Sequence, residues 1–506
     1  MKQFLSRSSS LTTLQRRFAH LNILRNSSFA TLTDKDITQF ESLLGPNGIL
    51  TGDAVEPHNS DWTKKYHGHS KLVLKPKTTE EVSAILRICD DKRLAIVPQG
   101  GNTGLVGGSQ PVFDEIVLNF SRMNQIIDFD ESYGIITCEA GCILQDLHTY
   151  LNAKGYLMPL DLGAKGSCQI GGNLATNAGG IHFIKYNSLH ANCVGLEAVV
   201  PGGRVLDNIT TLRKDNTGYD LKHLFIGAEG TLGAITKCAI LCPPLPKFRH
   251  LCLVSCRSFE QVLKILRSAK HELSDILQAV EFMDGNAMET TLSQLNFKNP
   301  FESRLYPFYA LVEVASNREG TETPDRLYEL LGSADDLIIE GVVAQDETQL
   351  SHIWQIREEI ASAYIKRGYT LKYDLSLAPE HFYKIVDDTR DVISRSPTFT
   401  ANEKHSIAVT GYGHIGDGNV HLNVCIPGYD DHDLQDRLSG LVDGYVFEYV
   451  RKARGSVSAE HGVGLQKAQY LNYSKSENMI HYMKEIKRVF DPHGIMNPYK
   501  VLPDAK

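Results

Sequence analysis

Residues 97–109 of the chain have the sequence VPQGGNTGLVGGS, which joins an apolar run to a glycine-rich loop. The apolar run LAIVP at residues 94–98 predicts a buried strand, which leads directly into a loop with five glycines. Glycine tolerates a positive φ and lets several backbone N–H groups converge on one anion, so this loop is a candidate phosphate cradle. For this loop alone, an ordinary turn at the end of a strand is an equal alternative.

Two further segments have the same glycine-rich composition. PLDLGAKGSCQIGGNLATNAGG spans residues 159–180, and GAEGTLGAIT spans residues 227–236. Repeated loops of this kind in one domain predict a long ligand that is held along its length, and a dinucleotide with a pyrophosphate fits. The chain also contains a G-x-G-x-x-G match at Gly411, Gly413 and Gly416. This match leads into DGNVHLNV, which predicts a strand rather than a helix, so we reject a Rossmann nucleotide site there.

Composition excludes several classes of protein. The chain has 506 residues, of which 42% are hydrophobic and 22% are charged, as in ordinary globular proteins. Its formal charge of −8 argues against general binding of nucleic acid. No apolar run approaches the roughly 18–20 residues that cross a bilayer. The ten cysteines form no C-x-x-C pair and several lie in apolar runs, which predicts free thiols in a reducing compartment.

Residues 1–33 differ from the rest of the chain. They contain five basic and no acidic residues, together with six serines and four threonines. An arginine- and serine-rich segment without acids is typical of a mitochondrial transit peptide. A disordered basic tail is the alternative.

Three regions follow this leader, and together they predict an α+β fold. Residues 50–245 alternate short strands and helices and hold the glycine-rich loops. For residues 246–455, alternating strands and helices predict a mainly antiparallel, ferredoxin-like sheet with helices on one face, including one long helix over 347–367. Residues 456–506 form a last segment. Its helix, SENMIHYMKEIKRVF, carries an apolar stripe that consists of Met479, Met483, Ile486 and Phe490.

The segment GYGHIGDGNVHLNV predicts a hairpin with Asp417-Gly418 as a two-residue turn. In that register His414 lies directly opposite His421, where Cβ atoms are roughly 4.5–5.5 Å apart, and the two imidazoles can share a metal ion. Glu460 and His461, in SAEHGVG, offer a carboxylate ligand and a candidate base whose pKa lies near working pH. A pair of surface histidines and an exposed charged turn are the alternatives.

Two cations are candidates for binding an acidic substrate. Arg357 lies on the predicted helix 347–367, and Lys372 lies on the polar side of the strand YTLKYDLSL. An arginine can hold a carboxylate with two hydrogen bonds, whereas a lysine contributes a point charge. Taken singly, each is more simply explained as a solvated surface charge.

The three glycine-rich segments, together with RKDNTGYDL, resemble the FAD-binding domain of the vanillyl-alcohol oxidase/PCMH flavoprotein superfamily. The resemblance implies a PCMH-type FAD-binding domain of two α+β subdomains, a substrate (cap) domain, and a C-terminal segment that returns to the flavin. It implies FAD contacts at Pro98, Gly100, Gly101, Asn102, Thr103, Gly104, Leu105, Gly108, Ser109, Pro159, Gly163, Ser167, Gly171, Gly172, Asn173, Asn177, Gly179, Gly180, Glu229, Gly230, Ile235 and Asn497. Some relatives bind the flavin covalently through a histidine, but residues 98–109 hold none, so we expect dissociable FAD.

GHIGDGNVH, AEHGVG, WQIREEI and KYDLSL are similar to motifs of the D-2-hydroxy-acid dehydrogenases within this superfamily. The resemblance covers nearly everything from residue 50 to the end. It implies zinc, or another divalent metal, on His414, His421 and Glu460, substrate contacts at Arg357, Lys372, Asn423 and His461, and a catalytic base at His461. Relatives have a threonine one turn after the arginine, whereas this chain has Ala361, which removes a hydroxyl from the distal end of the substrate site.

The same resemblance implies oxidation of D-2-hydroxyglutarate to 2-oxoglutarate in the mitochondrial matrix, with electron transfer flavoprotein as the electron acceptor. In this hypothesis the metal acidifies the substrate hydroxyl, His461 removes its proton, and a hydride passes from C2 to the flavin. A D-lactate dehydrogenase that reduces a cytochrome is one alternative, and a catalytically silent protein that binds flavin and metal is another. The resemblance leaves a homodimer open.

Overall fold

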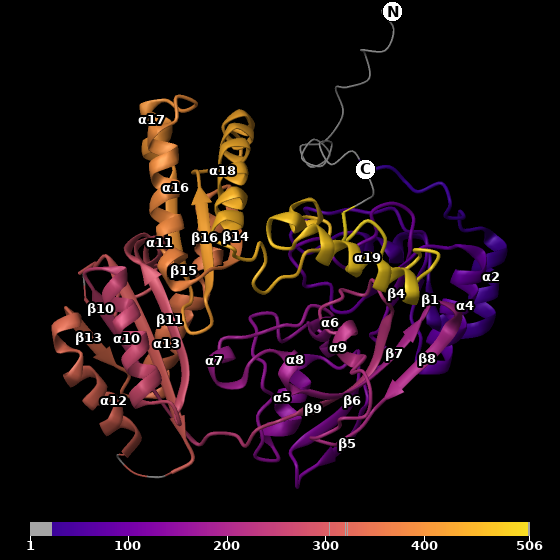
Figure 1. Cartoon of the computed structure of the whole chain (residues 1–506), viewed down its shortest axis with the longest axis horizontal. Coiled ribbons are helices and arrows are strands. Elements are labelled where there is room, and N and C mark those ends of the chain that lie inside the picture. The colour runs from indigo at the N-terminus through magenta and orange to yellow at the C-terminus, as the bar shows by residue number, and fades with distance from the viewer. Residues whose placement is uncertain (1–22, 303, 319, 321, 504–506) are drawn as a thin grey trace, which may run out of the picture.

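The computed structural model describes residues 23–302, 304–318, 320 and 322–503, so most of the predicted leader lies outside the described residues. Figure 1 shows two lobes. Strands β1 to β9 build the N-terminal lobe, drawn from indigo to magenta, and strands β10 to β16 build the C-terminal lobe. The yellow terminal segment, with helix α19 (Glu477–Phe490), returns to the N-terminal lobe. At the start of the described chain, Arg25 pairs with Asp114 of the N-terminal lobe at 2.6 Å.

Two sheets form the N-terminal lobe. The first has the order β1 (Ile49–Leu50), β2 (Val73–Leu74), β4 (Ile116–Asn119), β3 (Ile96–Gln99), and its last three strands are parallel. The second is antiparallel, in the order β5 (Ile126–Asp130), β6 (Ile135–Glu139), β9 (Ala234–Leu241), β7 (Cys193–Val200), β8 (Arg204–Asn208). Both sheets share one apolar core with helices α4 (Thr79–Lys92), α5 (Leu144–Asn152) and α6 (Ile170–Ala175). The lobe therefore consists of two joined α+β halves.

One seven-stranded sheet organises the C-terminal lobe. Its order is β13 (Glu340–Val343), β10 (Phe248–Cys256), β12 (Phe308–Ser316), β11 (Leu277–Asp284), β15 (Ala408–His414), β16 (Asn419–Cys425), β14 (Thr370–Ser376). Every neighbouring pair of strands is antiparallel, which confirms the predicted sheet.

Helices cover both faces of this sheet, so the predicted one-sided layer of helices is wrong. Cys252 and Val254 of β10 face a core that includes α10 (Phe259–Glu272), α12 (Glu322–Ser333), α16 (Lys384–Arg395) and α18 (His432–Lys452). Leu251 and Leu253 face a second core with α11 (Gly285–Leu295), α13 (Glu347–Glu358) and α14 (Ile360–Arg367). The uninterrupted apolar run LCLVSC is typical of a strand that is buried on both faces.

Two predicted helices differ in detail. The helix expected over 347–367 is two helices, because Glu359 has φ −86° and ψ 5° between α13 and α14. On α19, Ile486 and Phe490 pack against the core of the N-terminal lobe, but Met479 is 54% exposed, so the predicted stripe is only partly buried. The face of α19 that is buried is the one that contacts the N-terminal lobe, and the periodicity of apolar residues alone does not determine where that contact lies.

The hairpin of β15 and β16 has a four-residue loop rather than the predicted two-residue turn. Strand pairing starts at His414 opposite Asn419, and His421 lies opposite Tyr412. The predicted direct opposition of His414 and His421 is therefore wrong, because the N–H of Gly418 bonds the C=O of His414 at 3.2 Å and closes a wider turn. The register differs by two residues, so both histidines stay on the same face of the sheet as diagonal neighbours.

Several contacts join the lobes. Tyr186 of the N-terminal lobe donates from its hydroxyl to Gln278 of the C-terminal lobe at 3.0 Å. The terminal segment runs beside β3, where Ile96 N–H bonds the C=O of Ile495 at 2.9 Å and Asn497 N–H bonds the C=O of Ile96 at 2.8 Å. The terminal segment is thereby fixed to the core of the N-terminal lobe.

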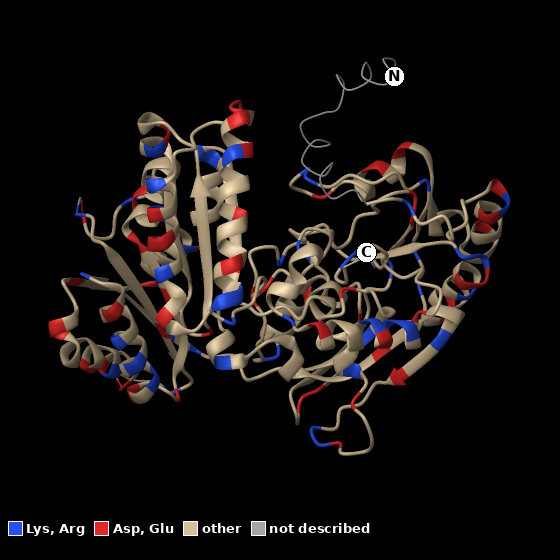
Figure 2. Ribbon diagram, turned by 45° about the horizontal axis from the view of Figure 1, so that its top comes forward, with Lys and Arg blue, Asp and Glu red and all other residues tan. Residues whose placement is uncertain are grey.

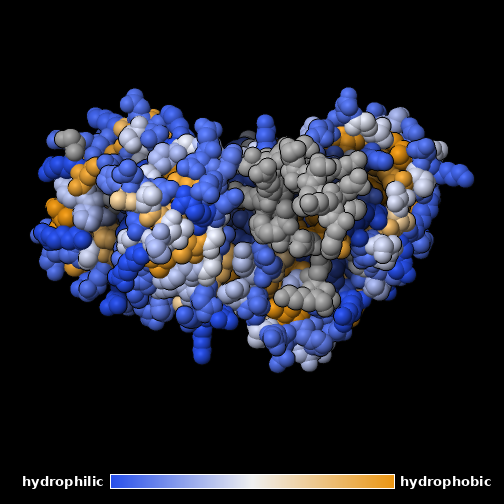
Figure 3. Space-filling model, turned by 90° about the horizontal axis from the view of Figure 1, so that it is seen from above, coloured by the Kyte–Doolittle hydropathy of each residue, from blue (hydrophilic) through white to orange (hydrophobic). Residues whose placement is uncertain are grey.

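The outer surface is mainly polar. In Figure 2, basic and acidic residues are interspersed along the outer helices. The face in Figure 3 is mostly hydrophilic, with apolar residues in small scattered groups. Within the described ranges, no helix combines the length and apolarity needed to cross a bilayer. The ten cysteines are all buried free thiols, which confirms the prediction from their spacing.

Candidate active site

The three predicted metal ligands lie together at the junction of the lobes. His414 ends β15, His421 lies on β16, and Glu460 follows α18 in the terminal segment. Their nearest donor atoms all lie within 4.8 Å of one another. Nε2 of His414 is 3.1 Å from Oε1 of Glu460. Two imidazoles and one carboxylate suit Zn²⁺ and leave a coordination position for a substrate.

The charges at this cluster also suit a cation. Burial lowers the pKa of His421 to about 3, so its imidazole is neutral near neutral pH. Burial opposes ionisation of Glu460, but His414 and His421 outweigh it and lower the pKa of the carboxyl to about 2. At His414, burial disfavours the proton, yet the carboxylates of Glu281 and Glu460 raise the pKa well above its usual value. The cluster therefore attracts positive charge, which a divalent cation can supply in place of a proton.

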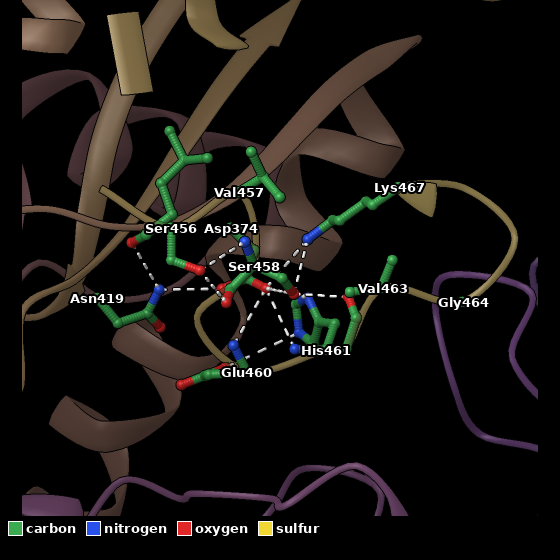
Figure 4. A network of polar contacts seen from close by, with 12 residues as sticks. Asp374, Asn419, Ser456, Val457, Ser458, Glu460, His461, Val463, Gly464 and Lys467 are labelled. Atoms are coloured by element: carbon green, nitrogen blue, oxygen red, sulfur yellow. Dashed lines mark hydrogen bonds and ion pairs between the residues drawn. The ribbon is translucent and has the colours of Figure 1, made fainter. Parts of the chain in front are cut away.

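Asp374 on β14 holds the predicted base, His461 (Figure 4). Its Oδ2 lies 3.2 Å from Nδ1 of His461 and accepts the backbone N–H of the same residue at 3.2 Å. Asn419 donates to Oδ1 at 3.0 Å, and Lys467 donates to Oδ2 at 3.4 Å. Because Asp374 occupies Nδ1, Nε2 is the ring nitrogen left to accept a proton. Burial lowers the pKa of His461, but Asp374 outweighs it and the pKa is raised.

Glu229 fastens the loop after His461 to the N-terminal lobe. Its two carboxylate oxygens accept the N–H of Val463 at 2.6 Å and of Gly464 at 2.8 Å. Gly462 has φ 79°, and a Cβ there would lie 2.8 Å from the Glu229 carboxyl, so this approach requires glycine. The contact fixes the position of the His461 loop on the lobe that carries the glycine-rich segments.

A cavity in the N-terminal lobe extends to His461. Its empty volume is about 980 Å³, part of which is open to solvent. The glycine-rich segments provide much of its wall. The residues with predicted FAD contacts that line it are Pro98, Gly100, Gly101, Asn102, Thr103, Gly104, Gly108, Ser109, Gly171, Gly172, Asn173, Glu229, Gly230 and Ile235.

The remaining residues with predicted FAD contacts do not line this cavity. They are Leu105, Pro159, Gly163, Ser167, Asn177, Gly179, Gly180 and Asn497. Asn497 donates from Nδ2 to the C=O groups of Gly108, at 2.9 Å, and Glu229, at 2.7 Å. It therefore supports two residues of the wall.

Gln169 lines the cavity but was missed by the sequence analysis, although it lies within the second glycine-rich segment. Its Oε1 and the Oδ1 of Asn173 are buried without a hydrogen-bond partner in the described part of the chain. Buried acceptors of this kind are expected to have a donor, and the N–H groups of FAD can supply one. A Cβ at Gly101 or Gly171 would collide with the neighbouring backbone, so in this wall two backbone segments lie closer together than a side chain would allow. These features fit FAD.

The predicted substrate cations lie on the same side of the sheet as the metal ligands. Arg357, at the end of α13, is 5% exposed, and its guanidinium lies 5.1 Å from the ring centre of Tyr412. Lys372 lies opposite Asn423 across β14 and β16, and Asp374 lies opposite His421. Asn423 donates to the Tyr412 hydroxyl at 3.3 Å. The strand register thus aligns Lys372, Asp374, His421 and Asn423 on one face.

Comparison with known proteins identifies the class. Residues 70–208 match the family model "FAD binding domain", and residues 245–501 match "FAD linked oxidases, C-terminal domain". Among solved structures, p-cresol methylhydroxylase with substrate bound aligns with a TM-score of 0.73 at 14% identity, over 94% of this chain and 98% of that chain. The fold is therefore the predicted PCMH type, and the chain belongs to the FAD-linked oxidases.

Within this family, the two relatives described below are dehydrogenases named for 2-hydroxy acids. D-2-hydroxyglutarate dehydrogenase, mitochondrial, from Arabidopsis thaliana is 50% identical over 486 residues, which are 96% of this chain and 84% of the relative. A putative mitochondrial D-lactate dehydrogenase from Schizosaccharomyces pombe is 46% identical over 494 residues, which are 95% of this chain and 93% of the relative. The predicted resemblance to D-2-hydroxy-acid dehydrogenases is confirmed.

Proposed function

We propose that this protein is a mitochondrial FAD-dependent dehydrogenase that oxidises D-2-hydroxyglutarate to 2-oxoglutarate. The observation that carries the proposal is the convergence of His414, His421 and Glu460, with His461 in the wall of the adjoining cavity. The name of the Arabidopsis relative, and its 50% sequence identity with this chain, support the assignment of D-2-hydroxyglutarate as substrate and of the mitochondrion as location. The matrix as compartment and electron transfer flavoprotein as acceptor rest on the resemblance alone.

Each group has a distinct task in this reaction. Bound FAD would accept the hydride from C2 of the hydroxy acid. His414, His421 and Glu460 would hold a divalent ion, zinc foremost, which would lower the pKa of the substrate hydroxyl. Nε2 of His461 accepts the hydroxyl proton, and the adjacent carboxylate of Asp374 stabilises the imidazolium that results.

Arg357, Lys372 and Asn423 bind the acid. Two cations in addition to the metal favour a dicarboxylate, because a monocarboxylate needs only one anchor beyond the ion. Lys372 keeps access to solvent, and its Nζ lies 3.4 Å from the C=O of Ala361, one turn after Arg357. This arrangement supports a second substrate carboxylate near Lys372.

Substrate capture is expected to weaken above pH 8. Although Lys372 is exposed at the surface, desolvation by the chain packed around its ammonium, with Lys65 nearby, lowers the pKa of Lys372 to about 8. The lysine is charged below that pH and neutral above it, so kcat/KM for D-2-hydroxyglutarate falls as the pH rises through about 8. A pH profile of kcat/KM checks this. In Lys372→Met the fall near pH 8 disappears, whereas Lys366→Met, which removes an exposed lysine bonded to the C=O of Gln294, retains it. A wild-type profile that is flat across this range contradicts the role of Lys372.

Ala361 favours D-lactate oxidation as the second candidate, since alanine offers no hydroxyl to a second carboxylate. Comparing kcat/KM for D-2-hydroxyglutarate and D-lactate with an artificial dye as acceptor separates the two. A charged hydrogen bond contributes roughly 1.5–3 kcal/mol, so we expect D-2-hydroxyglutarate to be favoured by about tenfold or more. A higher kcat/KM for D-lactate than for D-2-hydroxyglutarate would identify the protein as a D-lactate dehydrogenase. Absence of turnover with either acid would favour the silent flavin- and metal-binding protein.

A further inference from the structure

We propose that Glu281 is a positioning residue that fixes the metal ligand His414 and the substrate-binding Arg357 through one buried carboxylate. This inference rests on the proposed function, because it assigns a role to a residue that supports the same site. Glu281 lies on β11, which is central in the seven-stranded sheet, and only 1% of it is exposed. It was not among the site residues predicted from the sequence.

The two carboxylate oxygens of Glu281 have different partners. Oε1 lies 2.7 Å from Nδ1 of His414, and Oε2 lies 2.9 Å from Nε and 2.7 Å from Nη2 of Arg357. The strand register explains the first contact, since β11 pairs with β15 with Phe282 opposite Gly413, which brings Glu281 beside His414. The second contact joins the end of α13 to the same strand. One side chain therefore links two functional groups that lie far apart in sequence.

The contact with His414 determines which ring nitrogen faces the metal ligands. When Nδ1–H donates to Glu281, Nε2 carries the free lone pair, and Nε2 is the atom that lies 3.1 Å from Glu460. A histidine that ligates a metal commonly donates its other N–H to a carboxylate in this way. Glu281 thereby holds His414 in the tautomer that can bind a cation.

The contact with Arg357 determines the direction of the guanidinium. Glu281 accepts a hydrogen bond from Nε and forms an ion pair with the guanidinium at Nη2, and the ring of Tyr412 lies 5.1 Å from the guanidinium carbon. Arg357 is thus held on two sides before any substrate arrives. Preorganisation of this kind reduces the entropy lost when the substrate carboxylate binds.

Asp284 provides a matched comparison on the same strand. It is 2% exposed and pairs with Arg390 at 2.8 Å, so it is also a buried carboxylate with an arginine partner. It lies three residues after Glu281 and therefore points to the opposite face of the sheet. Its other partners are not among the predicted site residues, and they are the hydroxyls of Tyr383 and Thr410 and the N–H groups of Ala287 and Gly411. Neutralising Asp284 reproduces the loss of a buried charge without changing the site.

Glu281→Gln replaces one of the two acceptor oxygens by an NH₂ group. The remaining oxygen is expected to stay with Arg357, which is charged and donates a hydrogen bond from Nε. The NH₂ group then faces Nδ1 of His414 and forces that nitrogen to act as an acceptor. His414 consequently presents Nε2–H to the metal site, and the zinc affinity falls by roughly 10- to 100-fold.

The experiment measures the affinity of the purified FAD-loaded protein for Zn²⁺ by competition with a chromophoric chelator, after removal of bound metal. The variants are wild type, Glu281→Gln, Asp284→Asn and His414→Ala, and the visible flavin spectrum and a thermal melt report folding. We expect Glu281→Gln to bind zinc roughly 10- to 100-fold more weakly and Asp284→Asn to bind it as wild type does. Where Glu281→Gln gives no folded protein, Glu281→Asp, which is too short to reach both partners, is measured instead.

Zinc affinity of either Glu281 variant within about twofold of wild type, with His414→Ala strongly impaired, would overturn the role of Glu281 and leave the proposed metal site intact. If His414→Ala also binds zinc as wild type does, the metal site itself is wrong. An equal loss of affinity in Asp284→Asn would also overturn the role of Glu281, because any buried carboxylate of β11 would then have the same effect. The expected pattern is a loss in the Glu281 and His414 variants alone.

Discussion

Replacing His461 by alanine is expected to slow the reduction of the flavin by substrate by about 10²- to 10⁴-fold while FAD stays bound. The cavity is lined mainly by the glycine-rich segments, and His461 contributes only part of its wall, so retention of FAD follows. Rapid mixing of the variant with D-2-hydroxyglutarate without oxygen measures the reduction, and the visible spectrum of the purified protein reports the FAD content.

His493→Ala is the matched control for this experiment. His493 pairs with Asp90 at 2.7 Å and does not line the cavity, so its removal is expected to leave the rate of flavin reduction unchanged. Flavin reduction at the wild-type rate in the His461 variant would remove this residue from the role of base. Loss of FAD from that variant would instead assign His461 to cofactor binding.

Replacing His421 by alanine is expected to remove the bound metal and lower turnover by more than about 100-fold. Losing a metal ligand lowers activity more than changing a residue that only hydrogen-bonds to a ligand. Burial keeps the His421 imidazole neutral, so it is available as a ligand. Elemental analysis of the purified protein measures the metal, and turnover of D-2-hydroxyglutarate measures the consequence.

Chelator treatment provides the companion experiment for His421. Wild-type protein that has lost its metal is expected to lose activity and to recover it when Zn²⁺ is added, whereas His421→Ala is not expected to recover. His405→Ala, at an exposed position of α17 (Ala401–Ser406), is the control and retains metal and activity. Full activity of the chelated wild-type protein, with no metal found, would contradict a metal-dependent reaction.

The sequence predicted that the three candidate metal ligands lie close to His461, because these residues belong to short motifs. GHIGDGNVH places two histidines near one turn, and AEHGVG pairs a carboxylate with a histidine. The predicted hairpin register was wrong by two residues. His414 and His421 nevertheless lie on the same face of the sheet, because a shift of two residues leaves every side chain on its original face. A shift of one residue would have separated the two histidines.

The supporting carboxylates could not be found in the same way. Asp374 lies two residues after Lys372, so alternation does put both on one face, but nothing local indicates that a loop almost ninety residues later brings His461 to it. Glu281 lies within the apolar strand QAVEFMD, and its partners are determined by the order of the strands in the sheet. Local periodicity predicts strands and faces, whereas strand order depends on the packing of the whole lobe.

The glycine-rich segments were the most informative part of the sequence for the fold. They predicted the N-terminal lobe and much of its cavity wall, including Gly100, Gly101 and Gly171. The placement of helices on both faces of the seven-stranded sheet was less predictable. The uninterrupted apolar run on β10 was the signal for burial on both faces, whereas the sequence prediction placed helices on only one face of the sheet.

Anaerobic titration of the FAD-loaded protein with D-2-hydroxyglutarate measures whether this hydroxy acid reduces the flavin. We expect the visible flavin absorbance to bleach in proportion to added D-2-hydroxyglutarate, L-2-hydroxyglutarate to leave it unchanged, and 2-oxoglutarate to form in equal amount. If the flavin stays oxidised with D-2-hydroxyglutarate, in protein that retains both FAD and zinc, this protein is not a D-2-hydroxyglutarate dehydrogenase.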